Sequence, residues 1–135
     1  SVAAAGSMLG SGGVIVMDET TDMVAAIANL ARFYAHESCG QCTPCREGSG
    51  WADKILHRLE SGYGEPQDID ALLEICENAI GRTICVFAEA FGWPIQSFIA
   101  KFRPEFERHI SERRCPFRPD AKPRPRGLPV AGASH

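Results

Sequence analysis

Three cysteines recur at three-residue intervals in the stretch Cys39-Gly40-Gln41-Cys42-Thr43-Pro44-Cys45, and Cys85 follows forty residues later. Two successive Cys-x-x-Cys gaps allow one loop to present three sulfurs to a single inorganic centre, and a distant cysteine can then close the cage. Four thiolates so arranged can enclose an iron–sulfur cube. The spacing therefore favours a [4Fe-4S] cluster and a role in electron transfer.

Other uses of cysteine fit this spacing less well. Zinc ribbons and fingers usually pair two Cys-x-x-Cys knuckles, or one knuckle with histidines, whereas only Cys85 follows here. A two-cluster ferredoxin would place its next cysteine at position 49, which is Ser49. Six cysteines could form disulfides, but no secretory leader pattern opens the chain. Zinc remains the alternative to the cluster, and disulfides come third.

Length and charge limit the classes of function. The chain has 135 residues, 44% of them hydrophobic, which suits one compact core. No apolar run approaches the ~20 residues that cross a bilayer, so no membrane span is predicted. The net charge of −3 combines a basic segment at residues 113–126 with an acidic remainder. Because that segment lacks interleaved aromatic residues, nucleic-acid binding is not predicted.

Residues 1–18 are predicted to be a lead-in with one short strand. Residues 1–13 are small, glycine-rich and without periodicity, which indicates a flexible segment or the edge of a larger protein. The β-branched run Val14–Met17 predicts a short buried strand or an extended segment on the core.

Residues 19–112 are predicted to form a mainly α-helical bundle of four to five helices. The first helix follows the N-cap candidates Thr20, Thr21 and Asp22 and runs to about His36. A third helix opens near Pro66 and ends at Gly81. Its apolar face includes Cys76, which therefore reads as a core residue.

The second helix begins inside the cysteine motif. Thr43 is expected to cap it and Pro44 to be its first helical residue. Its predicted buried stripe is Trp51, Ile55 and Leu59.

Thr83 repeats the Thr-x-Cys arrangement and so places Cys85 near a helix start, as Thr43 does for Cys45. Unpaired first-turn amides and the positive end of the helix dipole stabilise anionic sulfur. Both thiolates are therefore expected to face helix N-termini.

The last helix is predicted to start at Pro94, after an interruption at Gly92 and Trp93, and to kink or restart at Pro104. Trp93, like Trp51, is expected in the core.

Residues 113–135 are rich in proline and arginine and are predicted to form an extended tail. No role is predicted for Cys115, which heads this tail as a free thiol.

The stretch from Phe33 to Gly48 closely resembles the family of NADH-binding, 51-kDa-type flavoprotein subunits of respiratory complex I. The resemblance covers about residues 10 to 112 and includes Gly81-Arg82-Thr83-Ile84-Cys85, Trp93-Pro94 and Phe102-Arg103-Pro104-Glu105. In that family the motif cysteines bind a four-iron cluster in a C-terminal helical bundle. The resemblance therefore implies that the cluster ligands are Cys39, Cys42, Cys45 and Cys85.

The same resemblance implies the partners and the direction of electron flow. The cluster would accept single electrons from FMN, which NADH reduces, and pass them to the next iron–sulfur centre towards ubiquinone. Nothing before Cys39 resembles a nucleotide cradle, so FMN and NADH are expected on a separate or missing domain. The 24-kDa-type and 75-kDa-type iron–sulfur subunits are the other expected partners.

Three residues beside the motif are candidates for a second shell around the cluster: Arg46, Thr43 and Gly40. A fixed cation at Arg46 would favour the reduced state, although an ordinary salt bridge is an equal alternative.

No residue is predicted to perform bond-making catalysis. The expected location is the matrix side of the mitochondrial inner membrane, with the cytoplasmic face of a bacterial plasma membrane as the alternative. The alternative functions are the equivalent part of an NAD-linked hydrogenase or formate dehydrogenase, or a structural zinc-binding interaction module.

Overall fold

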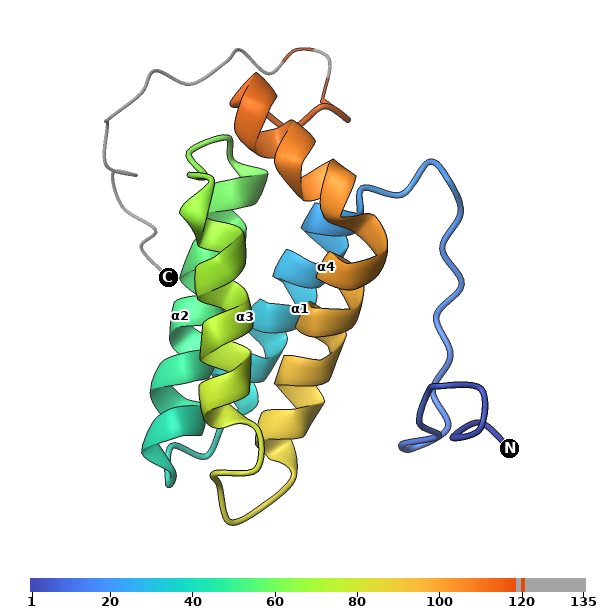
Figure 1. Ribbon diagram of the computed structural model, residues 1–135, viewed down its shortest axis with the longest axis vertical. Helices are drawn as coiled ribbons and strands as arrows, with labels where there is room; N and C mark the ends of the chain where they lie inside the picture. The colour runs from blue at the N-terminus through green and yellow to red at the C-terminus, as the bar shows by residue number, and fades with distance from the viewer. Residues whose placement is uncertain (119, 121–135) are drawn as a thin grey trace.

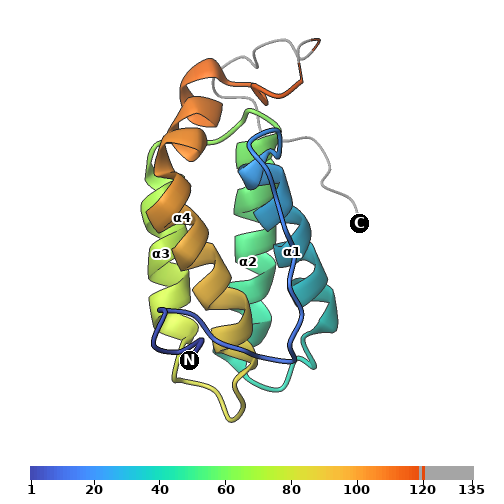
Figure 2. The ribbon, with the colours of Figure 1, turned by 90° about the vertical axis from the view of Figure 1, so that its right-hand side faces the viewer.

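The computed structural model describes residues 1–118 and 120 and contains four helices. These are α1 (Met23–Glu37), α2 (Thr43–Glu60), α3 (Gln67–Ala79) and α4 (Phe87–Glu112). Successive helices run in opposite directions and lie side by side in an up-and-down bundle (Figures 1 and 2). Within the described chain, every pair of helices is in contact except α1 and α3. The α2–α4 contact therefore crosses the centre of the bundle.

Residues at helical spacing on each helix form one continuous core. The largest side chains in it are fully buried, which removes apolar surface from water and holds the four helices together. They are Val24, Ile27, Leu56, Leu59, Ile69, Leu72, Phe91, Ile95, Ile99 and Phe106. Cys76 is also 0% exposed and belongs to this core, and its burial raises the pKa of its thiol to about 12. The prediction of a core role for Cys76 is confirmed.

An ion pair joins α2 to α3 at the edge of the core. The carboxylate of Asp68, which is 3% exposed, accepts hydrogen bonds from both Nε and Nη2 of Arg58. It also accepts from the backbone N–H of Glu65, at 2.8 Å. The buried charge is thus paired and hydrogen-bonded, as a buried carboxylate requires.

The prediction of an N-terminal strand is wrong. No strand occurs among the described residues, and Val14, Ile15 and Val16 are 85%, 80% and 90% exposed. A β-branched run forms a strand only when another strand pairs with it, and the described chain offers none. The segment instead leaves the bundle where α1 begins and extends along its outside (Figure 1).

The last helix is longer than predicted. It begins at Phe87 and passes through Pro94 without a break, so the bundle has four helices rather than five within the described residues. Burial of Phe91, Ile95 and Ile99 on one stripe outweighs the backbone hydrogen bond that the proline removes. The predicted kink near Pro104 is confirmed, because Phe102 has non-helical angles of φ −126° and ψ 25°.

Both tryptophans lie outside the core, contrary to prediction. Trp51 is 54% exposed and Trp93 is 46% exposed. Of the predicted stripe on α2, Leu59 is fully buried and Ile55 is partly buried, whereas Ala52 and Leu56 occupy the rest of the buried face in place of Trp51. No helix in the described part of the chain is long and apolar enough to cross a membrane.

Candidate metal centre

Two loops at the same end of the bundle, together with the first turn of α2, carry the four motif cysteines. Residues 38–42 join α1 to α2, and residues 80–86 join α3 to α4. Because the helices alternate in direction, both connections fall at the same end, the lower one in Figures 1 and 2. The up-and-down topology thus places at one end of the bundle two segments that lie about forty residues apart in the sequence.

The first loop is fixed by contacts that involve its glycine. Gly40 has φ +78°, a left-handed conformation that side chains with a Cβ rarely adopt. Its N–H donates to Ser38 Oγ at 3.3 Å, and its carbonyl oxygen accepts from Arg46 Nη1 at 2.7 Å. Ser38 Oγ also lies 3.4 Å from Cys45 Sγ. Two residues of the predicted second shell, Gly40 and Arg46, therefore bind each other across the cysteine loop.

The four cysteines differ in exposure. Cys45 is buried in the first turn of α2, and Cys42 immediately before that helix is half-buried. Cys39 and Cys85 are exposed on their loops. A group bound by all four would sit at the surface of the bundle end, anchored on its inner side by Cys45.

The helices that begin at this end lack side-chain caps. The N-cap residues of α2 and α4 are Cys42 and Val86, and neither makes a side-chain capping hydrogen bond. At the opposite end, Asp22 caps α1 by accepting hydrogen bonds from the N–H groups of Val24 and Ala25, whereas the N-cap residue of α3, Pro66, makes no side-chain capping hydrogen bond. Open first-turn amides at the cysteine end leave donors and a positive dipole for thiolates.

Neither threonine caps as predicted. Thr43 is the first helical residue of α2 rather than its N-cap, and Thr83 Oγ1 donates to the carbonyl oxygen of Cys85 at 2.7 Å. The expected N-cap bonds to backbone amides are therefore absent at both positions, within the described residues.

Among the described residues, the motif cysteines are not drawn together as they would be around a single zinc ion. Zinc–sulfur bonds of about 2.3 Å in a tetrahedron place the sulfurs about 3.8 Å apart. Among the described residues, the one group with three ligand atoms all within 4.8 Å of one another is Asp22, His109 and Cys115, and no three motif cysteines qualify. A four-iron cube holds its thiolates further apart than one ion does. Four cysteines are the usual ligand set of a [4Fe-4S] cluster.

Apolar surface adjoins this end of the bundle. Ile84 and Val86 flank Cys85 and are 84% and 78% exposed. A groove of about 460 Å³ between α2 and α3 is lined by residues that include Pro44, Trp51 and Ile75. Such clustered apolar exposure is typical of a surface that another protein covers.

Residues 25–109 match the family model described as the NADH-ubiquinone oxidoreductase-F iron-sulfur binding region. The F-type subunit of the NADH-quinone oxidoreductase of Rickettsia bellii is 54% identical over 110 residues, which are 82% of this chain and 26% of that protein. The mitochondrial NADH-ubiquinone oxidoreductase 51 kDa subunit of Neurospora crassa is 55% identical over 104 residues, 77% of this chain and 21% of that protein. The chain spans about a quarter of the length of these curated relatives.

A solved structure shares the fold. The NAD+-reducing [NiFe]-hydrogenase in its H2-reduced state matches with a TM-score of 0.67 and 37% sequence identity. The match covers 70% of this chain and 17% of the hydrogenase chain.

Proposed function

The chain belongs to the NADH-ubiquinone oxidoreductase-F iron–sulfur binding region family, and from that premise we propose that it relays single electrons through one [4Fe-4S] cluster held by Cys39, Cys42, Cys45 and Cys85. The observation that supports the proposal is that both cysteine-bearing segments lie at the same end of the bundle. When bound, the cluster supplies reversible one-electron chemistry.

The chain's own residues position the sulfurs and set their surroundings. Cys45 is fixed by burial in α2, and the Arg46–Gly40 hydrogen bond holds the loop that presents Cys39 and Cys42. The open amides of α2 and α4 favour thiolates over thiols. Amide hydrogen bonds to sulfur raise a cluster's reduction potential. The starts of α2 and α4 would therefore both position the thiolates and raise the reduction potential of the cluster.

In the proposed relay, electrons would enter from FMN that NADH has reduced and would leave towards quinone through another iron–sulfur centre. The names of the relatives combine NADH with quinone or ubiquinone, and this chain spans only about a quarter of their length. The flavin and NADH therefore belong to a further domain or chain, and the 24-kDa-type and 75-kDa-type subunits complete the route. The assembly lies on the matrix side of the mitochondrial inner membrane or on the cytoplasmic face of a bacterial one.

The exposure at the cysteine end suits such a relay. Cys39 and Cys85 are exposed, and the exposed apolar residues Ile84 and Val86 flank Cys85 in the sequence. A flavin-bearing partner that covers this patch would shorten the distance to the cluster and exclude water from it.

The corresponding part of an NAD+-reducing hydrogenase is the second candidate. The fold match and 37% identity to such an enzyme favour it. Affinity purification of the chain from its native cells separates the two: quinone-reductase subunits support the first candidate, and hydrogenase subunits support the second.

Replacement of Cys85 by serine tests the ligand set. The anaerobically reconstituted chain should contain four irons and four sulfides and should give a paramagnetic signal after reduction with dithionite. The Cys85→Ser chain should lose most of its iron and this signal, whereas the control Cys76→Ala should keep both because Cys76 lies in the core. Undiminished iron in Cys85→Ser would show that the proposed cage is wrong.

A further inference from the structure

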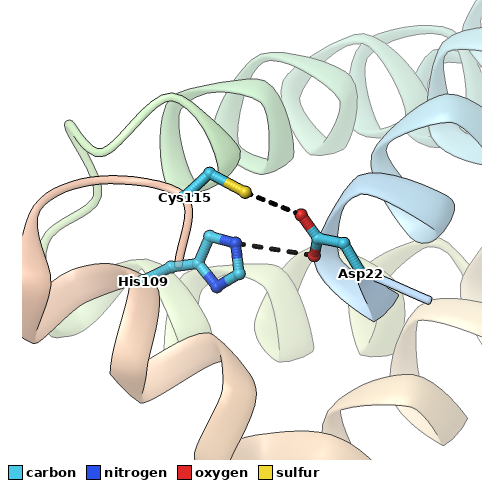
Figure 3. A group of neighbouring side chains, drawn as sticks. All are labelled: Asp22, His109 and Cys115. Atoms are coloured by element: carbon cyan, nitrogen blue, oxygen red, sulfur yellow. Dashed lines mark hydrogen bonds and ion pairs between the residues drawn. The ribbon is translucent and has the colours of Figure 1, made fainter. Parts of the chain in front are cut away.

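A second group of possible metal ligands lies at the other end of the bundle. Asp22 at the start of α1, His109 near the end of α4 and Cys115 just after α4 each place one ligand atom within 4.8 Å of the others (Figure 3). His109 is 0% exposed and Cys115 is 4% exposed. This end is opposite to the loops that carry the motif cysteines (Figure 1).

The imidazole of His109 has one nitrogen bound and one available. Its Nδ1 lies 2.8 Å from the carbonyl oxygen of Glu105, which can only accept a hydrogen bond, so Nδ1 carries the proton in the neutral ring. Its buried Nε2 makes no hydrogen bond and points towards Asp22 Oδ1, 3.5 Å away (Figure 3). Histidines that bind metals usually show this arrangement, because the second-shell carbonyl fixes the tautomer.

The other two side chains are also held in place. Asp22 Oδ1 accepts from the N–H groups of Val24 and Ala25 at 3.0 and 3.1 Å, which fixes the carboxylate. Its Oδ2 accepts from Cys115 Sγ at 2.9 Å. Arg113 ends α4 in a left-handed conformation with φ +52°, and the chain reverses so that Cys115 reaches a partner 93 residues earlier.

The charge around the group is negative. Glu60 Oε1 is buried without a hydrogen bond, and this carboxylate acts on both His109 and Cys115. Arg118 Nη2, 3.3 Å from Glu60 Oε1, offsets part of that charge. A divalent cation bound by Asp22, Cys115 thiolate and neutral His109 would leave the three ligands and the ion neutral together.

We propose that Asp22, His109 and Cys115 bind one zinc ion through a carboxylate oxygen, Nε2 and Sγ. The mixed oxygen, nitrogen and sulfur donors are the ligand types of zinc, and the thiolate disfavours magnesium and calcium. A water molecule fills the fourth tetrahedral position. The thiol proton of Cys115 is released to solvent as the Zn–S bond forms. The ion ties the start of α1 to the turn after α4, independently of the iron–sulfur cluster.

Cobalt titration of the full chain with Cys39, Cys42, Cys45 and Cys85 all replaced by serine tests this site, because the probe then cannot occupy the cluster ligands. One Co2+ per chain should bind with a thiolate-to-cobalt charge-transfer band, and one equivalent of Zn2+ should displace it. Cys115→Ser should abolish the band, and His109→Asn should weaken binding at least ~10-fold. Circular dichroism checks that each variant remains helical.

His57→Asn is the matched control, since His57 Nδ1 also lies close to a carboxylate, 2.8 Å from Asp53 Oδ1, but has no thiol in its group. It should leave cobalt affinity unchanged. Should the serine background unfold, thermal unfolding of the cluster-loaded chain replaces the titration: Zn2+ should raise its Tm, and the shift should vanish in His109→Asn. In the titration, the proposal is overturned if cobalt gives no thiolate band, if the band survives Cys115→Ser, or if His57→Asn weakens cobalt binding as much as His109→Asn does. In the thermal unfolding experiment, it is overturned if Zn2+ raises the Tm of the His109→Asn chain as much as that of the unsubstituted chain. Each of these results would leave the three residues as a hydrogen-bonded network only.

Discussion

Arg46 Nη1 donates a 2.7 Å hydrogen bond to the carbonyl oxygen of Gly40, so the first turn of α2 holds the loop that precedes it. Arg46 Nε also lies 2.9 Å from Glu47 Oε1, and both side chains are about half exposed. The two interpretations of Arg46, as a cation near the cluster and as a salt-bridge partner, are thus both compatible with the structure. They can be separated by substitution.

Arg46→Gln should lower the reduction potential of the cluster. Loss of a partly screened positive charge disfavours the reduced state by about 0.5 kcal/mol, which is on the order of 20 mV for one electron. Potentiometric titration followed by the paramagnetic signal measures the shift. Glu47→Gln is the control of opposite sign and should raise the potential; equal potentials in all three chains would remove Arg46 from the tuning role.

Gly92→Ala and Gly50→Ala should change stability in opposite directions. Both glycines lie inside helices, where alanine gains up to about 1 kcal/mol of helix propensity. A Cβ at Gly92 would meet Ile80 Cδ1 at 2.9 Å, whereas a Cβ at Gly50 would meet nothing within 4 Å. Overpacking costs about 1–3 kcal/mol, so Gly92→Ala should lower and Gly50→Ala should raise the urea midpoint. A higher midpoint for Gly92→Ala would mean that Ile80 moves freely.

Acid should destabilise the chain through Asp22. Burial raises the pKa of this carboxyl, but His109 and the hydrogen bonds from Cys115 and Ala25 outweigh it and lower the pKa from 3.8 to about 2. A lowered folded-state pKa contributes stability above pH ~4 that is lost as the pH falls towards ~2.

The loss should amount to about 1–2 kcal/mol, because the carboxyl is partly exposed. Urea unfolding of the cluster-free chain in EDTA at about pH 5 and about pH 2.5 measures it. Asp22→Asn keeps a capping side chain and should show a smaller loss over the same range. An identical acid dependence in both chains would contradict the prediction.

Alkylation should distinguish the cysteines of the cluster-free chain. Cys39 and Cys85 are exposed and should react first with iodoacetamide at mildly alkaline pH. Burial raises the pKa of Cys76 to about 12 from 9.0, which lowers its thiolate fraction ~1000-fold, and the side chain is 0% exposed. Mass spectrometry should therefore find Cys76 modified only after global unfolding. Early modification of Cys76 would show that α3 opens locally.

The helices were predictable because their apolar residues repeat at helical spacing, as Ile69 and Leu72 do on α3. Residue type alone predicted the wrong buried residue on α2 and the wrong first residue of α4. Trp51 is the largest apolar side chain on its turn, but Ala52, Leu56 and Leu59 together define the buried face. Pro94 predicts a helix start locally, yet the packing of Phe91 and Ile95 on either side carries α4 through it.

The two ends of the bundle differed in how far the sequence could predict them. The cysteine spacing indicates a cluster because three candidate ligands are local, and their assignment as ligands stays a prediction. The group at Asp22 has no such signature, since Asp22 and Cys115 are 93 residues apart and meet only because Arg113 reverses the chain. A contact of that kind depends on tertiary packing and leaves no periodic pattern in the sequence.

The up-and-down topology also orders events during synthesis. Cys39, Cys42 and Cys45 leave the ribosome together, but the loop bearing Cys85 reaches them only after α3 has been made and has folded back. If the four cysteines are the ligands proposed above, a nascent chain exposes three of them without the fourth for the time it takes to translate forty residues. Iron and sulfide would therefore have to be inserted after the loop that carries Cys85 has folded back, or a carrier protein would have to protect Cys39, Cys42 and Cys45 until then.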